Sequence, residues 1–117
     1  MDATLIVELI KGGHNGIWAP EWPRLEHDDD YVVVGSARPL EDAWRASQVG
    51  MIAWLGELFG LDRLHAYQLL TQVSASPIAN VVDVNYSAVT KVPKQFLPAA
   101  DAYGGMHRHL RTLARDL

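Results

Sequence analysis

Residues 31–93 read YVVVGSARPLEDAWRASQVGMIAWLGELFGLDRLHAYQLLTQVSASPIANVVDVNYSAVTKVP, and this stretch decides the fold because its apolar pattern changes twice. It starts with a β-branched run, Tyr31 to Val34, which predicts a strand that Gly35 ends. From Leu40 to Leu58 the apolar residues recur at intervals of three and four, which is the spacing of one helix face. After Pro77 the pattern returns to extended segments. This order predicts an α+β fold.

Two consecutive helices form the centre of the stretch. Pro39 stands where a helix start tolerates proline, and Gly60 suits the left-handed conformation that ends a helix. Asp62 is placed to cap the second helix. The residues expected in the core lie on one stripe of each helix: Leu40, Ala43, Trp44, Ser47, Met51, Trp54, Leu55 and Leu58 in the first, and Leu64, Tyr67, Leu70 and Val73 in the second. A helical hairpin is therefore expected.

The other expected elements lie outside the hairpin. Their composition predicts strands at Thr4–Ile10, Ile78–Val84 and Ser87–Val92, a loop over residues 12–30 with a short extended piece at Arg24–Glu26, and a helix over Met106–Leu117 after Gly104-Gly105. We expect residues 1–117 to form a single domain in which a small mixed or antiparallel sheet packs against the helical hairpin, with a short peripheral C-terminal helix within residues 99–117.

Composition narrows the function classes. The net charge of -4 argues against a nucleic-acid partner, because neutralising phosphates needs a basic face. Without cysteine there is no disulfide, thiolate metal site or cysteine nucleophile. The start of the chain lacks the pattern of a secretory signal, and no run approaches the roughly 18 apolar residues of a membrane span. No membrane association and a cytoplasmic location are therefore expected.

The five histidines raise the question of a metal site, which needs three or four convergent donors. His107 and His109 are two residues apart on a helix, so they point in opposite directions, and His65 is expected to be exposed. The weak metal candidates are the loop residues His14, His27, Asp28 and Asp30. An acidic run is more often a solvated turn, so no metal or other cofactor is predicted for this chain.

The sequence contains no motif typical of a serine nucleophile. No serine stands in a Gly-x-Ser-x-Gly elbow, and no Ser-x-x-Lys sequence occurs. Trp18 and Trp22 lie in a loop, where an aromatic side chain either packs back on the body or meets a partner, so both are interface candidates.

Seven short motifs resemble, in their order and spacing, the C-terminal part of the acetamidase/formamidase family. They are Trp22-Pro23-Arg24, Gly35-Ser36-Ala37, Leu40-Glu41-Asp42-Ala43, Met51-Ile52-Ala53-Trp54-Leu55, Ala66-Tyr67-Gln68-Leu69-Leu70, Val81-Val82-Asp83 and Val92-Pro93-Lys94. The resemblance covers residues 3–96, which is less than half the length of a complete enzyme of that family.

The resemblance implies hydrolysis of a short amide to a carboxylate and ammonia, with the divalent metal of the family enzyme held by an N-terminal part that this chain does not contain. It makes Asp83 a candidate for the cleft, whereas an acid common in the family falls here at Ala75. We therefore expect a C-terminal domain or small subunit that is not catalytic alone and binds a small amide only in a complete assembly. It would form a homo-oligomer or join a companion N-terminal-type chain. The alternatives are a non-catalytic binding or oligomerisation module with the same fold and, less favoured, an independent hydrolase using the loop from His14 to Asp30.

Overall fold

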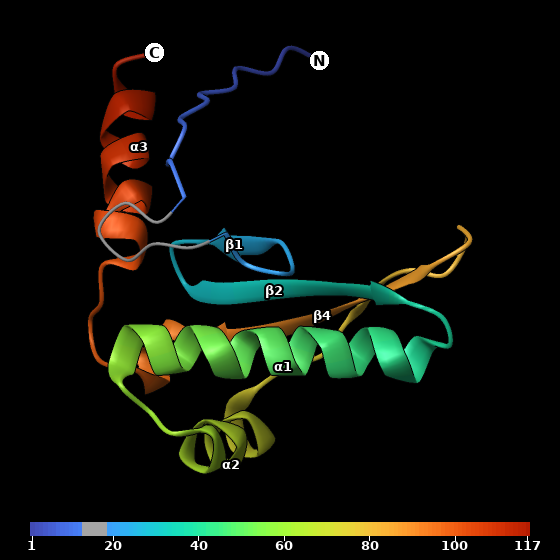
Figure 1. Ribbon diagram of the computed structural model, residues 1–117. Helices are drawn as coiled ribbons and strands as arrows, with labels where there is room; N and C mark the ends of the chain where they lie inside the picture. The colour runs from blue at the N-terminus through green and yellow to red at the C-terminus, as the bar shows by residue number, and fades with distance from the viewer. Residues whose placement is uncertain (13–18) are drawn as a thin grey trace.

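The computed structural model describes residues 1–12 and 19–117. Within them the chain forms an antiparallel sheet of four strands in the order β1-β2-β4-β3, and three α-helices (Figure 1). The elements are β1 (Arg24–Glu26), β2 (Asp30–Ala37), α1 (Leu40–Phe59), α2 (Arg63–Val73), β3 (Ile78–Asn80), β4 (Tyr86–Pro93), the short 3-10 turns Lys94–Phe96 and Ala102–Gly104, and α3 (Met106–Arg115). The α+β class expected from the sequence is confirmed. No helix in the described ranges is long and apolar enough to cross a membrane.

The two long strands, β2 and β4, form the centre of the sheet, and α1 lies across one of its faces (Figure 1). They pair in register, with Tyr31 opposite Val92 and Val33 opposite Thr90. Opposed residues of an antiparallel pair point to the same face, so these side chains meet the helix together. The apolar stripe of α1 supplies Met51, Trp54 and Leu55, all at most 2% exposed, as its spacing predicts.

Gly35 allows α1 to approach the sheet closely. A Cβ atom added at Gly35 would lie 2.3 Å from the carbonyl oxygen of Ala43 and 2.4 Å from the backbone nitrogen of Ser47. Both are backbone atoms of successive helical turns, so neither can rotate away. The residue type at position 35 therefore sets the distance between helix and sheet.

A chain of hydroxyl and amide groups lies in the same interface. Ser47 Oγ donates to the carbonyl oxygen of Trp44 over 2.8 Å, and it lies 2.7 Å from Thr90 Oγ1. Because a hydroxyl carries one hydrogen, Thr90 donates to Ser47, while Gln48 Nε2 donates to Thr90 over 2.8 Å. Every polar atom of the fully buried Ser47 and Thr90 side chains is thus satisfied.

The second helix begins as predicted, with Asp62 accepting a hydrogen bond from the backbone nitrogen of His65 over 3.0 Å. Its expected buried face is partly wrong. Leu70 is buried, but Leu64 and Tyr67 are 74% and 53% exposed. The helix α2 packs against α1 and β4 through a narrow stripe, so the structure buries the residues of that stripe, Ala66 and Leu70.

Three further predictions are wrong. Thr4–Ile10 forms no strand of the described sheet, because a strand also needs a partner to pair with. The strand predicted for Ile78–Val84 ends at Asn80, whose side-chain oxygen accepts a hydrogen bond from the backbone nitrogen of Val82 and turns the chain. Trp44 is 43% exposed because it lies at the margin of the α1 stripe, where its indole nitrogen reaches Ser76.

Candidate functional site

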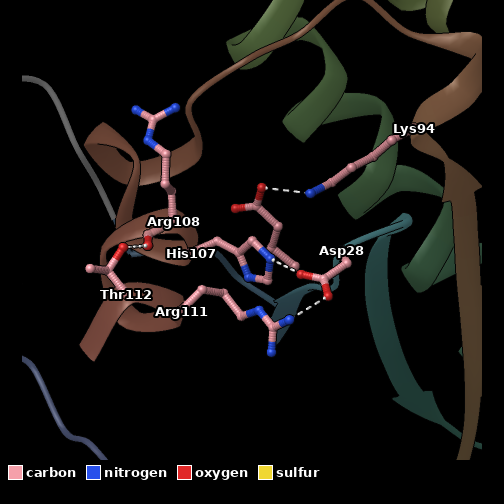
Figure 2. A network of polar contacts seen from close by, with 7 residues as sticks. Asp28, Lys94, His107, Arg108, Arg111 and Thr112 are labelled. Carbon is pink, nitrogen blue, oxygen red and sulfur yellow. Dashed lines mark hydrogen bonds and ion pairs between the residues drawn. The ribbon is translucent and has the colours of Figure 1, made fainter. Parts of the chain in front are cut away.

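The densest polar cluster lies where α3 meets β1 and the turn that follows β1 (Figure 2). The strand β1 presents Arg24 and Glu26 toward α1, because they are opposite Val33 and Tyr31 of β2. The turn supplies Asp28. The first turns of α3 supply His107 and Arg111, which share one helix face because they are four residues apart.

Asp28 joins the two basic side chains of α3. Its Oδ1 lies 2.9 Å from His107 Nε2, and its Oδ2 lies 3.0 Å from Arg111 Nη2. The hydrogen bond with His107 and the positive charge of Arg111 hold the pKa of Asp28 below its ordinary value. The carboxylate therefore stays charged and ties α3 to the end of the sheet.

Arg24 forms the buried part of the same region. Its guanidinium makes two hydrogen bonds to the carboxylate of Glu57, of 2.6 and 2.9 Å, and one to Tyr103 Oη over 3.0 Å. It also lies over the ring of Trp54, 5.2 Å from the centroid. Burial acts to lower the pKa of Arg24, but the hydrogen bonds to Glu57 and Tyr103 outweigh it, and the net shift is upward. The guanidinium thus joins β1, α1 and the segment before α3.

Tyr103 has a backbone conformation that few residues other than glycine adopt. Its φ is 50°, in the left-handed region, and two glycines with positive φ follow it, Gly104 and Gly105. A tyrosine stays in this conformation only where its surroundings hold it. The contacts that hold it are the hydrogen bond from Arg24 and the packing of its ring 6.3 Å from that of Trp54.

A second ion pair extends the cluster toward β4. Lys94 Nζ lies 2.9 Å from Glu26 Oε1 and 4.9 Å from the centre of the Tyr31 ring. Figure 2 shows Lys94 on the side of the Asp28 and His107 contact that is opposite Arg111 and Thr112. Burial, followed by the negative charges of Glu26 and Asp101, raises the pKa of Tyr31. The tyrosine hydroxyl therefore stays protonated at neutral pH.

A cleft of about 230 Å³ opens between these groups. Its lining consists of Arg24, Glu26, Trp54, Tyr103, Met106, His107 and Leu110. An imidazole oriented by a carboxylate, as His107 is by Asp28, is the arrangement of a general base. None of the seven lining residues is a serine, threonine, cysteine or lysine, so the lining offers the base without an aliphatic hydroxyl, thiol or amine nucleophile.

The metal candidates of the loop do not converge. His14 lies outside the described residues, Asp30 pairs with Lys91 at 3.4 Å, and Asp28 pairs with His107 and Arg111. His27 is exposed. No group of three or more His, Asp or Glu side chains that would hold a metal ion occurs in residues 1–12 and 19–117. These residues therefore do not fit the divalent metal that the family resemblance implies.

The remaining candidates within residues 19–117 lie apart from the cleft. Trp18 is outside the described residues, whereas Trp22 is partly buried and packs beside Gly50 of α1. Asp83 lies in an exposed turn, where it accepts a hydrogen bond from Asn80 Nδ2, and it does not line the cleft. Among the candidates that the structure describes, only Asp28 belongs to the polar cluster.

Sequence reasoning missed His107, Arg24 and Tyr103 as members of one site. Asp28 and His107 are 79 residues apart, as are Arg24 and Tyr103. The only available signal was charge: the acidic run Asp28–Asp30 and the basic residues of α3 are opposite in sign. Opposite charge indicates that two segments attract each other, but it does not indicate which of their residues pair.

Comparison with known proteins gives one informative relative. No protein-family model matches this sequence, and neither does any curated protein. Among solved structures, an acetamidase from Yersinia enterocolitica matches with 38% sequence identity and a TM-score of 0.67. The match covers 70% of this chain and 25% of the acetamidase, so the chain spans about a quarter of that relative. The chain is thus similar, in sequence and in structure, to one part of an acetamidase.

Proposed function

We propose that this chain is the C-terminal domain or a small subunit of an acetamidase/formamidase-like amide hydrolase, and that it is not catalytic alone. The observation that carries the proposal is the 38% identity to an acetamidase over 70% of this chain, combined with coverage of only a quarter of that enzyme. The complete assembly would convert a short amide and water to a carboxylate and ammonia. Its other chemical groups would come from a companion N-terminal-type chain.

The chemistry of amide hydrolysis supports this division. The reaction needs an activated water or nucleophile, and donors that stabilise the negative oxygen of the tetrahedral intermediate. The polar side chains of the cleft are already engaged: Arg24 with Glu57, Glu26 with Lys94, and His107 with Asp28. These pairs connect β1 to α1 and to the 3-10 turn after β4, and connect α3 to the turn after β1, so they act as structural contacts between elements. In this proposal the divalent metal of the family enzyme belongs to the companion chain.

The test is ammonia release from formamide and acetamide. The purified chain is assayed alone, and again after mixing with a companion protein that resembles the rest of an acetamidase. We expect no release above the rate in buffer from the chain alone, and release from the mixture. Ammonia release by the isolated chain would refute the proposal, and a matched His107→Gln variant would then show whether the His107 and Asp28 pair is responsible.

One observation favours the second candidate function, a non-catalytic binding or oligomerisation module with the same fold. Leu5, Val7 and Leu9 are 85%, 89% and 84% exposed, which is unusual for three aliphatic residues in one short segment. Light scattering during size-exclusion chromatography distinguishes this function. A stable oligomer that gives no ammonia with any companion chain would support the module over the subunit.

A further inference from the structure

The segment Thr4–Ile10 has the alternating exposure of a β-strand but pairs with no strand of the described sheet. Its exposure alternates, with Leu5, Val7 and Leu9 at 84–89% and Ile6 and Ile10 at 37% and 39%. This period of two is that of a β-strand with one apolar face turned to solvent. Residues 1–12 make no backbone hydrogen bond to another described residue.

The less exposed face of this segment is directed toward α3. Glu8, which has the same parity as Ile6 and Ile10, lies 3.9 Å from His109 Nε2. Figure 1 shows the N-terminal segment leaving the body of the molecule on the side of α3. The face that carries Leu5, Val7 and Leu9 therefore points away from α3.

A receiving edge exists at the other end of the sheet. The strand β3 is terminal in the order β1-β2-β4-β3, and the residues from Ala75 to Ala79 are all exposed. Beside β3 lies a mainly apolar groove of about 380 Å³ between the sheet and the first half of α1. Its apolar walls include Leu40, Trp44 and Ile78, of which Trp44 is 43% and Ile78 is 58% exposed.

The register of the sheet directs an added strand into this groove. Ile78 is opposite Ala88, and both line the groove, so a residue placed opposite Ile78 on the outer side faces the groove as well. The next groove-facing residues of the added strand are two positions away on each side, which is the spacing of Leu5, Val7 and Leu9. Leu5, Val7 and Leu9 would therefore all face the apolar wall of the groove.

The charges at the rim also match. Lys11 has the same parity as Leu9, so on a continuing strand it points to the same face. Of the two charged groove residues, Arg45 is paired with Asp42 at 2.7 Å, whereas Glu41 makes no ion pair with another described residue. The rim therefore offers the negative charge of Glu41 to Lys11, the residue that follows the segment.

We propose that Thr4–Ile10 of one copy of this chain adds to the free edge of β3 in a second copy, with Leu5, Val7 and Leu9 in the groove beside Trp44. Unpaired strand edges favour such addition, because main-chain hydrogen bonds supply affinity and alternate side chains supply specificity. Each copy carries both the strand and the edge, so the exchange is reciprocal and closes as a two-fold dimer. The inference stands independently of the amide hydrolase function.

The absence of native cysteine makes a direct test available. Two single-cysteine variants, Val7→Cys and Ile78→Cys, are purified separately, mixed, and treated with a short bis-maleimide cross-linker. We expect a cross-linked dimer in roughly tenfold higher yield than from Val7→Cys mixed with the control Val49→Cys, because docking raises the effective concentration of the two thiols. Val49 is also exposed, at 62%, but lies outside the groove. Equal yields from both mixtures would overturn the proposal.

Size-exclusion chromatography with light scattering provides the second measurement. We expect twice the monomer mass of 13.0 kDa for the unchanged chain, and 13.0 kDa for Val7→Asp. The control Thr4→Asp places the same charge on the opposite face and should remain dimeric. A monomer at every concentration, or a dimer that Val7→Asp leaves intact, would overturn the proposal.

The experiment must also distinguish pairing between two copies from pairing of Thr4–Ile10 with β3 of the same copy. Residues 11–22 span up to roughly 40 Å when extended, so the segment has the length to reach β3 of the same copy. A Val7→Cys/Ile78→Cys double variant that cross-links only within one copy would overturn the proposal of a second copy. None of these results depends on ammonia release, so failure here leaves the amide hydrolase function to its own test.

Discussion

Replacing Gly35 by alanine tests the contact that sets the distance between α1 and the sheet. The new methyl carbon would lie 2.3 Å from the carbonyl oxygen of Ala43, and ordinary contact begins at 3.4 Å, so the helix must retreat by about 1 Å. Overpacking of a core costs roughly 1–3 kcal/mol when side chains can adjust. Here the opposing atoms belong to the helix backbone, so we expect a loss of about 3 kcal/mol in the free energy of unfolding.

The retreat of α1 also disturbs the buried hydrogen bond between Ser47 and Thr90, which lies in the same interface. For a chain of this length, a loss of about 3 kcal/mol corresponds to a fall of roughly 12 °C in the midpoint of thermal unfolding. Circular dichroism during urea and thermal unfolding measures both quantities.

The matched control is Gly12→Ala. A Cβ atom at Gly12 would have no neighbour within 4 Å, so the substitution should change stability by less than about 0.5 kcal/mol. If Gly35→Ala proves as stable as Gly12→Ala, the reasoning from the close approach of helix and sheet is wrong.

Three further changes test the buried and polar contacts. Thr90→Val keeps the side-chain shape but removes the hydroxyl that donates to Ser47, so we expect the free energy of unfolding in urea to fall by roughly 1–3 kcal/mol. A much smaller fall in Thr90→Ser would identify the hydroxyl as the cause. Folding lowers the pKa of Asp28, so the contribution of its carboxylate to stability is present above the ordinary value of 3.8 and disappears as the pH falls through the lowered value. Protection of the α3 amides from hydrogen exchange should fall in that pH range. The Asp28→Asn variant should show the reduced protection already at pH 7. Unchanged protection in Asp28→Asn would contradict this role. Arg24→Met retains an apolar stem over Trp54 but loses the ion pair, so it should cost roughly 1–2 kcal/mol, and less than Arg24→Ala, as thermal unfolding would show.

The parts of the fold that follow from local chemistry were predictable. The α1 helix needs only its own periodicity, its proline start and the glycine at position 60, whose φ of 66° ends it as expected. The cap at Asp62 likewise depends on a residue three positions away. The stripe that buries Trp54 follows from the same periodicity, but the position of Trp44 at its margin does not, because exposure depends on which neighbour covers that margin.

The candidate site shows the limit of such reasoning most clearly. Asp28 and His107 are both visible in the sequence, and each was interpreted by its own surroundings, as a solvated acid and as one of two diverging histidines. Their contact depends on how β1, the turn after it and α3 are placed, and no residue within one turn of either reveals that placement.

The sequence by itself determined the α+β class, the two consecutive helices and the cap at Asp62, because periodicity and capping act over a few residues along the chain. The order of its motifs indicated the family resemblance. Only the tertiary structure decided that Thr4–Ile10 remains unpaired and that Arg24, Tyr103 and His107 surround one cleft. The physical reason is that a strand needs a partner strand, and a site needs side chains from several elements to meet in space. Both are properties of residues far apart in the chain, which propensity does not bring together.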